Sequence, residues 1–228
     1  MPGVNELVRL ALVGVVGGLG VFVLISPVAV LLQRRRFGRW RPLRLIGVAA
    51  ICVYTMALAG LTVAPAYEVA VTCSRRVGGE LRAVPFHAIT QIIDTYSAGT
   101  TGIGLLIAWP TLQLIANIVL FVPLGAILRG VFRLDVTTAL AMGVMLSVLI
   151  EATQYTGAWG LYPCGVRIAD IDDVFSNSLG AWMGAMLAPL LTRLGVPLFG
   201  REERHWSRTG EIDVLEDIAG RGDSGRRR

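Results

Sequence analysis

Five long apolar stretches divide the chain, and shorter polar segments separate them. The stretches run over Leu7–Leu32, Leu43–Ala64, Thr111–Leu128, Val136–Thr153 and Asp173–Leu194. Each is close to the roughly 20 residues that a helix needs to cross the hydrocarbon core of a bilayer. The pattern therefore predicts an all-α fold, a polytopic membrane bundle of about five transmembrane helices.

Composition and the placement of charge add an orientation to this picture. Hydrophobic residues make up 54% of the 228 residues and charged residues 16%, which leaves no room for a separate soluble domain. All 21 basic residues are arginines, and they gather after the first stretch, at Arg129 and Arg133, and beyond the last stretch. Because arginine-rich loops remain in the cytoplasm, we expect the N-terminus outside and the C-terminus inside. The arginine run directly abuts two predicted spans, so no nucleic-acid partner is expected.

The same pattern divides the chain into three parts. Residues 1–79 are predicted to form a helical hairpin of two spans and the start of an extracytoplasmic loop. Within the first span, Gly14 and Gly18 have the GxxxG spacing that permits close helix contact. Residues 80–196 are predicted to form a membrane core of three spans. Residues 197–228 mix acidic and basic side chains, which predicts a disordered cytoplasmic tail.

The loop between the second and third stretches is the largest predicted extracytoplasmic segment. Tyr67–Cys73 and Glu80–Val84 flank a glycine-containing turn, which favours a short hairpin. Apolar residues then recur at i, i+3, i+4 and i+7, at Ile89, Ile92, Ile93 and Tyr96. This spacing predicts a short helix that lies in the membrane interface. Ile103–Trp109 is also apolar, and the sequence leaves open whether it re-enters the membrane.

Two of the three cysteines fall in loops on the same predicted side. Cys73 lies in the second loop and Cys164 in the fourth, both outside, where disulfides persist. They are candidates for a disulfide that ties these loops together. The alternative is two unrelated thiols, because sequence does not give their separation.

Polar residues interrupt the apolar stretches in a regular way. On the fourth stretch, one helical face carries Ala139, Gly143, Ser147, Glu151 and Gln154. On the fifth, one face carries Asp173, Asn177, Gly180 and Gly184. Such side chains are costly in hydrocarbon, so they are expected to face the bundle interior.

The outer ends of the fourth and fifth spans are where these polar faces meet. Glu151, Gln154, Asp170 and Asp173 are predicted to lie near each other there. Arg167, in the connecting loop, is placed to neutralise part of their charge, and Asn117 lies on the third stretch.

These polar residues, in this order, resemble the VanZ-like family of bacterial integral membrane proteins. The resemblance covers about residues 80–190, and Asn117–Gly125 carries it together with Ser147, Glu151, Gln154, Arg167, Asp170, Asp173, Asn177 and Gly180. Val84-Pro85-Phe86 is also similar to the Pro-Phe element before the family's core. The resemblance implies a multi-pass protein of the bacterial plasma membrane. The family's namesake is associated with low-level teicoplanin resistance, so a link to glycopeptide resistance is a further hypothesis.

Three functions are compatible with these residues. The first is binding of an anionic lipid head group or cell-wall precursor at the outer leaflet by Asn117, Glu151, Gln154, Arg167, Asp170, Asp173 and Asn177. The second is a membrane-embedded enzyme that acts on such a lipid, with Glu151 or Asp173 as general acid or base. The third is a polar network that only holds the spans together. Binding is favoured over catalysis, because no nucleophile with a partner base is apparent, and His87 and His205 fall on opposite predicted sides.

The expected partners are few. Glu151, Asp170 and Asp173 could hold a hard cation, but helix capping explains the aspartates more simply. We therefore expect no metal and no cofactor. The lipid bilayer is the expected partner, and the sequence does not determine the oligomeric state.

Overall fold

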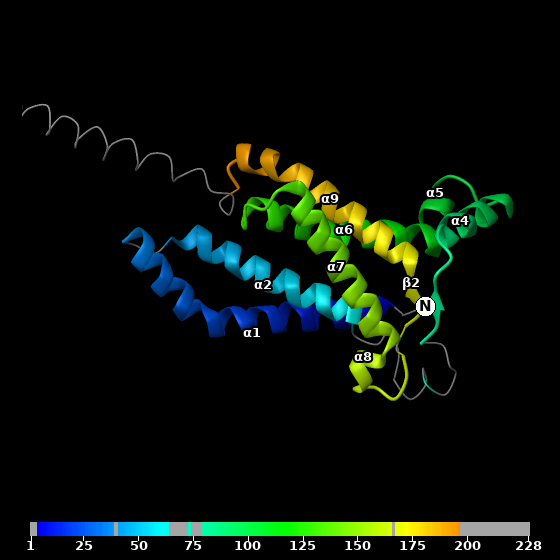
Figure 1. Ribbon diagram of the computed structural model, residues 1–228, viewed down its shortest axis with the longest axis horizontal. Coiled ribbons are helices and arrows are strands. Elements are labelled where there is room, and N and C mark those ends of the chain that lie inside the picture. Colours follow the sequence, from blue (N-terminus) through cyan, green and yellow to red (C-terminus); the bar gives the residue numbers. More distant parts are fainter. Residues whose placement is uncertain (1–3, 39–40, 64–72, 74–78, 166, 197–228) are drawn as a thin grey trace, which may run out of the picture.

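The computed structural model describes residues 4–38, 41–63, 73, 79–165 and 167–196 (Figure 1). Its long helices are α1 (Val4–Phe37), α2 (Pro42–Val63), α6 (Trp109–Gly130), α7 (Val136–Tyr155) and α9 (Ile171–Arg193). Within the described ranges, five helical segments are long and apolar enough to cross a membrane, one in each of these helices. The predicted all-α polytopic bundle is confirmed.

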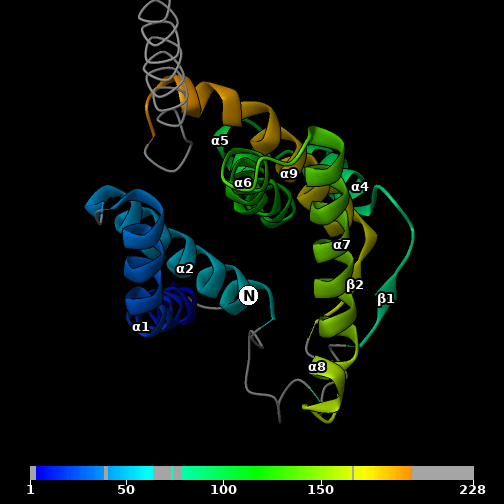
Figure 2. The same ribbon diagram turned by 60° about the vertical axis from the view of Figure 1, so that its left-hand side comes forward.

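Helices α1 and α2 form an antiparallel hairpin beside the other three spans (Figure 2). A Cβ atom added to Gly14 would lie 2.7 Å from Cα of Ala57, and one added to Gly18 would overlap the backbone of Val53. The GxxxG pair of α1 therefore lets the two helix backbones approach closely. The hairpin is tied to the core by the Tyr54 hydroxyl, which donates to the Leu120 carbonyl at 2.9 Å.

The core consists of α6, α7 and α9, and its tightest contact is between α6 and α9. Small residues make this contact possible. A Cβ atom on Gly125 would overlap the Ala181 carbonyl, and one on Gly184 would overlap the Val122 carbonyl. Ala181 is fully buried, as is Phe121 on the facing side of α6. The glycines predicted to lie on one face of the fifth span thus pack directly against the third.

Prolines inside spans leave carbonyl groups without their usual helical donor, and in α1 and α9 a side chain replaces that donor. Pro189 frees the carbonyl of Ala185, and the Arg129 guanidinium on α6 donates to that oxygen at 2.9 Å. In α1, Pro27 frees the carbonyl four residues earlier, to which the Ser26 hydroxyl donates at 2.9 Å. Arg129 therefore links α6 to α9 through a backbone carbonyl that is left without a helical donor because of Pro189.

Short elements gather at one end of the bundle. They are β1 (Leu81–Arg82), α4 (His87–Ser97), α5 (Ile103–Leu106), α8 (Gly157–Gly160) and β2 (Ala169–Asp170). Strand β1 pairs with β2 in parallel, with Leu81 opposite Ala169 and Arg82 opposite Asp170. Strand β1 lies in Glu80–Val84, the second arm of the predicted hairpin, and it pairs with a segment almost 90 residues further along the chain. Most of the first arm, Tyr67–Cys73, lies outside the described residues.

Helix α4 contains the apolar stripe predicted for an interfacial helix. Ile89, Ile93 and Tyr96 are exposed along it. The apolar segment that follows forms the short helix α5, and Pro110 occupies the first turn of α6, where its missing N–H removes no helical bond. The predicted tail, residues 197–228, lies outside the described part of the chain.

Candidate functional site

Glu151 and Asp170 join the C-terminal end of α7 to the start of α9. Glu151 is buried in the last turns of α7, and its Oε2 accepts a hydrogen bond from the backbone N–H of Asp170 at 2.9 Å. Two residues that the sequence analysis placed in the site are therefore in direct contact. The contact fixes strand β2 against α7 and places the start of α9 beside Glu151.

Asp170 has two further partners. Its Oδ1 accepts from the Asp172 N–H at 3.0 Å and caps α9, as a carboxylate at a helix start is expected to do. Its Oδ2 accepts from Nη1 of Arg82 at 2.9 Å. Arg82 is its cross-strand neighbour in the β1–β2 pair. Sequence reasoning missed this arginine, because the strand pairing that brings it here joins positions 88 residues apart.

Asp172 holds helix α4 in place. Its carboxylate accepts from the backbone N–H of Phe86 at 2.6 Å and of Ala88 at 2.7 Å. The residue before α4 is Phe86, which supplies no capping side chain, so Asp172 satisfies the free donors from another helix. The Phe86 ring also stacks on Phe175, with centroids 6.1 Å apart. Asp172 is thus a trans-acting cap that joins α4 to α9.

Asp173 faces α6. Its Oδ1 accepts from Nδ2 of Asn117 at 2.7 Å and from Nε2 of Gln113 at 3.3 Å. Asn117 was expected near the site, and Gln113 was not. The signal for Gln113 was present in the sequence, since it lies one helical turn before Asn117 on the same face.

Asn177 and Gln154 have a different role from the carboxylates around the start of α9. Asn177 Nδ2 donates to the Ser147 hydroxyl at 2.9 Å, which ties α9 to α7. Gln154 Nε2 donates to the Thr62 carbonyl at 2.6 Å, which ties α7 to α2. Both side chains are buried. The structure therefore places these two residues in helix contacts beneath the charged cluster.

Arg167 lies in the loop before β2, close enough to Asp173 and Glu151 to interact with both charges. Burial lowers the pKa of its guanidinium below the usual range, while the two carboxylates oppose that shift. Guanidinium groups stay protonated in proteins. Arg167 therefore supplies positive charge inside a cluster that also contains the carboxylates of Asp170 and Asp172.

A small hollow of about 20 Å³ lies beside these groups, with room for about one water-sized group. Strand β1 contributes Arg82 to its wall, α4 contributes His87 and Gln91, α6 contributes Gln113, and α9 contributes Asp172 and Asp173. The hollow thus presents one guanidinium, an imidazole, two amides and carboxylates. This set can bind a polar group that has both negative oxygens and hydrogen-bond donors.

The structure brings together most of the predicted site and adds to it. Asp170 and Asp173 line the hollow, while Glu151, Arg167 and Asn117 contact or face those two residues. Asn177 and Gln154 lie deeper in the bundle. The residues that sequence reasoning left out are the ones supplied by β1, α4 and the first turns of α6 and α9.

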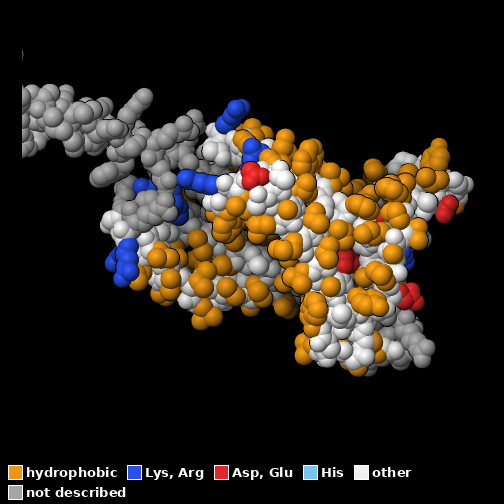
Figure 3. Space-filling model, viewed as in Figure 1, with side chains coloured by type: hydrophobic (Ala, Val, Ile, Leu, Met, Phe, Trp, Pro, Cys, Tyr) orange, Lys and Arg blue, Asp and Glu red, His pale blue; other side chains and the backbone are white. Residues whose placement is uncertain are grey.

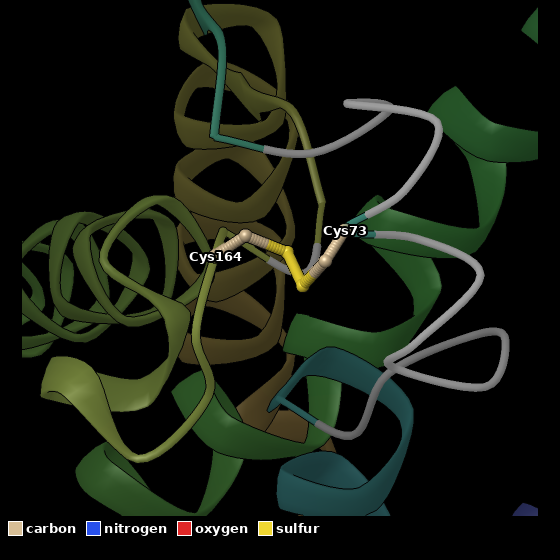
Figure 4. The surroundings of a disulfide bond; sticks show 2 residues. All are labelled: Cys73 and Cys164. Carbon is tan, nitrogen blue, oxygen red and sulfur yellow. A yellow bond between two sulfur atoms is a disulfide. The ribbon is translucent and has the colours of Figure 1, made fainter.

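A disulfide closes the same end of the molecule (Figure 4). Cys73 and Cys164, the pair for which the sequence left this bond open, have Cα atoms 5.6 Å apart and are joined through sulfur. Gly165, next to Cys164, packs against the backbone of Gly79. The bond therefore holds the second loop near the segment that leads to Arg167 and β2.

Comparison with known proteins agrees with this arrangement. The sequence model of the VanZ/LLP1 family matches residues 51–192, more than half of the chain. The match begins inside α2 and ends with α9, so it includes the whole polar cluster and extends beyond the segment 80–190 that carried the resemblance. No curated protein and no solved structure matches the chain. The chain is a multi-pass membrane protein that belongs to the VanZ-like family.

Proposed function

We propose that this VanZ-like protein binds the polar head group of an envelope lipid or cell-wall precursor over the hollow between α4, α6 and α9, with one polar atom of the head group inside it. The observation that carries the proposal is the convergence of His87, Gln91, Gln113 and Arg82 with the aspartates of α9 around one opening. These side chains come from four separate elements. Helix α4 is not a span. A network that only joined spans would therefore not need the polar side chains that α4 directs to the hollow.

The chemistry of the lining favours a head group with both acceptors and donors. The Arg82 side chain is 35% exposed while bridging Asp170, so it can also reach a phosphate oxygen. The carboxylates of Asp172 and Asp173 can accept from hydroxyl or ammonium groups. These carboxylates would repel a purely anionic ligand, so a head group that carries a hydroxyl or ammonium group beside its phosphate suits the lining better.

The orientation of the chain belongs to the same proposal. A disulfide persists outside the cytoplasm, which favours an extracytoplasmic position for the hollow. Basic side chains gather at the opposite end of the molecule (Figure 3). This distribution supports a cytoplasmic position for that end, with the N-terminus outside and the C-terminus inside, in a bacterial plasma membrane.

The test uses the full chain, extracted in mild detergent, and identifies bound molecules by mass. We expect the double substitution His87→Ala with Gln91→Ala to lose the bound molecule, because it removes both polar side chains that α4 contributes to the hollow. The matched control is Asp94→Asn, which lies on the same helix but not in the hollow. Equal occupancy in all three proteins, at equal abundance, would refute the proposal.

Catalysis is the second candidate, and the position of His87 favours it. His87 shares the hollow with Asp172 and Asp173, and an imidazole near carboxylates is a common acid–base arrangement. Glu151 and Asp173 are the acid–base candidates on the spans. Turnover of the bound lipid by the purified protein, abolished in Asp173→Asn, would establish this function. The link to glycopeptide resistance is tested by comparing the teicoplanin susceptibility of cells that produce the wild type with that of cells that produce these substituted proteins.

A further inference from the structure

We propose that the hollow takes its ligand sideways from the outer leaflet, and that the ligand is an amphiphile whose hydrocarbon tail lies on Phe86, Phe175 and Leu179. This inference rests on the proposed function and narrows it. It selects a membrane-borne ligand over a water-soluble precursor. It also assigns a role to α4, as a helix half-immersed in lipid.

The first step concerns the two faces of α4. His87 and Gln91 point to the hollow, whereas Ile89 and Ile93 on the opposite face are exposed. Ile93 is 55% exposed. A short helix with this division of polar and apolar faces, placed beside five spans, is suited to lie along the interface of a bilayer. One face of α4 then contacts lipid while the other closes the hollow.

The second step concerns the surface around α4. The following helix and the lead into α6 are also exposed and apolar, at Ile103, Leu106 and Ile107. Hydrophobic side chains cover much of the projecting end of the molecule that α4 and α5 form (Figure 3). A continuous apolar surface of this kind marks a contact with a membrane or a partner. Its continuity with membrane spans identifies the bilayer as the occupant.

The third step concerns the rim of the hollow. Asp172 lines the hollow, and Phe175 and Leu179 follow it along the same side of α9 at i+3 and i+7. Both are exposed, and Phe86 stacks on Phe175. The polar wall therefore passes directly into an apolar track on a spanning helix. A head group in the hollow has its tail beside that track without leaving the bilayer.

One arm of the test measures the position of α4 and needs no ligand. Nitroxides are attached at Ile93→Cys and, as the matched control one residue away, at Asp94→Cys, in a Cys52→Ala background with the disulfide intact, in nanodiscs. We expect oxygen to relax the spin at 93 more than a water-soluble nickel complex does, and the reverse at 94. Equal exposure of both positions to nickel would overturn the inference.

The other arm identifies what the full chain carries from the membrane. We expect a tail-bearing molecule, with occupancy about fivefold lower in Phe175→Ala because an aromatic contact with the tail is lost. Leu187→Ala, an exposed residue further along α9, is the matched control and should leave occupancy unchanged. A bound molecule without a hydrocarbon tail, or equal occupancy in Phe175→Ala, overturns the inference and leaves the proposed function standing. If no molecule is bound to any of these proteins, the proposed function fails, and the nitroxides still decide how α4 lies.

Discussion

Asp172 offers the sharpest test of how the end of the bundle that carries α4 is assembled. Its carboxylate accepts two backbone hydrogen bonds, from Phe86 at 2.6 Å and from Ala88 at 2.7 Å, and it is buried. Each bond to a charged acceptor contributes about 1.5–3 kcal/mol. Asp172→Asn keeps one oxygen but turns an NH₂ group toward the other donor. The expected loss is one such bond and the charge assistance of the second, about 2–4 kcal/mol in total.

This loss should appear as local opening of α4 rather than unfolding of the bundle. Helix α4 is not one of the spans, so the spans do not depend on its cap. Since about 1.4 kcal/mol is a factor of ten, amide exchange at the start of α4 should accelerate about 30- to 1000-fold. Hydrogen–deuterium exchange of the peptide covering residues 86–90, in detergent, measures it directly.

The control for this measurement is Asp94→Asn, which removes an exposed carboxylate from the same helix. It should leave exchange at the start of α4 within about twofold, because surface substitutions rarely change stability by more than about 0.5 kcal/mol. Unchanged exchange in Asp172→Asn would refute the trans-acting cap. Acceleration spread equally over α6, α7 and α9 would refute the local character of the contact.

Three further predictions concern the bundle and its covalent tie. Gly184→Ala should lower thermal stability in detergent by about 1–3 kcal/mol, because the methyl group overlaps a backbone carbonyl, whereas Gly20→Ala, with open space around it, should not. Arg129→Met should lower the free energy of unfolding by about 1.5–3 kcal/mol. In a Pro189→Ala background the loss should be less than half of that, because the new N–H donates to the carbonyl that Arg129 otherwise satisfies. Additive effects of the two substitutions would contradict this. After denaturation without reductant, the wild type should expose one reactive thiol per chain and Cys73→Ser two; three in the wild type would exclude the disulfide.

The helical framework follows from local chemistry, which is why the sequence predicts it well. The fourth span was expected over Val136–Thr153, and α7 runs over Val136–Tyr155. The spacing of four residues along it predicted one interior face, and Ala139, Gly143 and Ser147 are buried there. Length and periodicity decide these features, and neither requires knowledge of the partner helix.

The site depends on contacts between distant parts of the chain, and local patterns do not encode them. Arg82 reaches Asp170 through a strand pair of two residues each, too short to leave a periodic signal. In the sequence Asp172 is one of several acids near a helix start, and its actual role depends on where α4 docks. Sequence therefore identified the carboxylates but not the β1 and α4 side chains that complete the hollow.

The depth of each polar residue decides which substitution can separate function from architecture. Arg167→Ala removes the buried guanidinium that interacts with Glu151 and Asp173, and breaking a buried charge pair costs about 3–5 kcal/mol. Loss of protein in that variant would thus follow whether or not a ligand binds. His87 lines the hollow and hydrogen-bonds within α4 to Gln91, so His87→Ala removes no tie between spans. Normal abundance together with lost ligand in His87→Ala is an outcome that a purely structural network cannot produce.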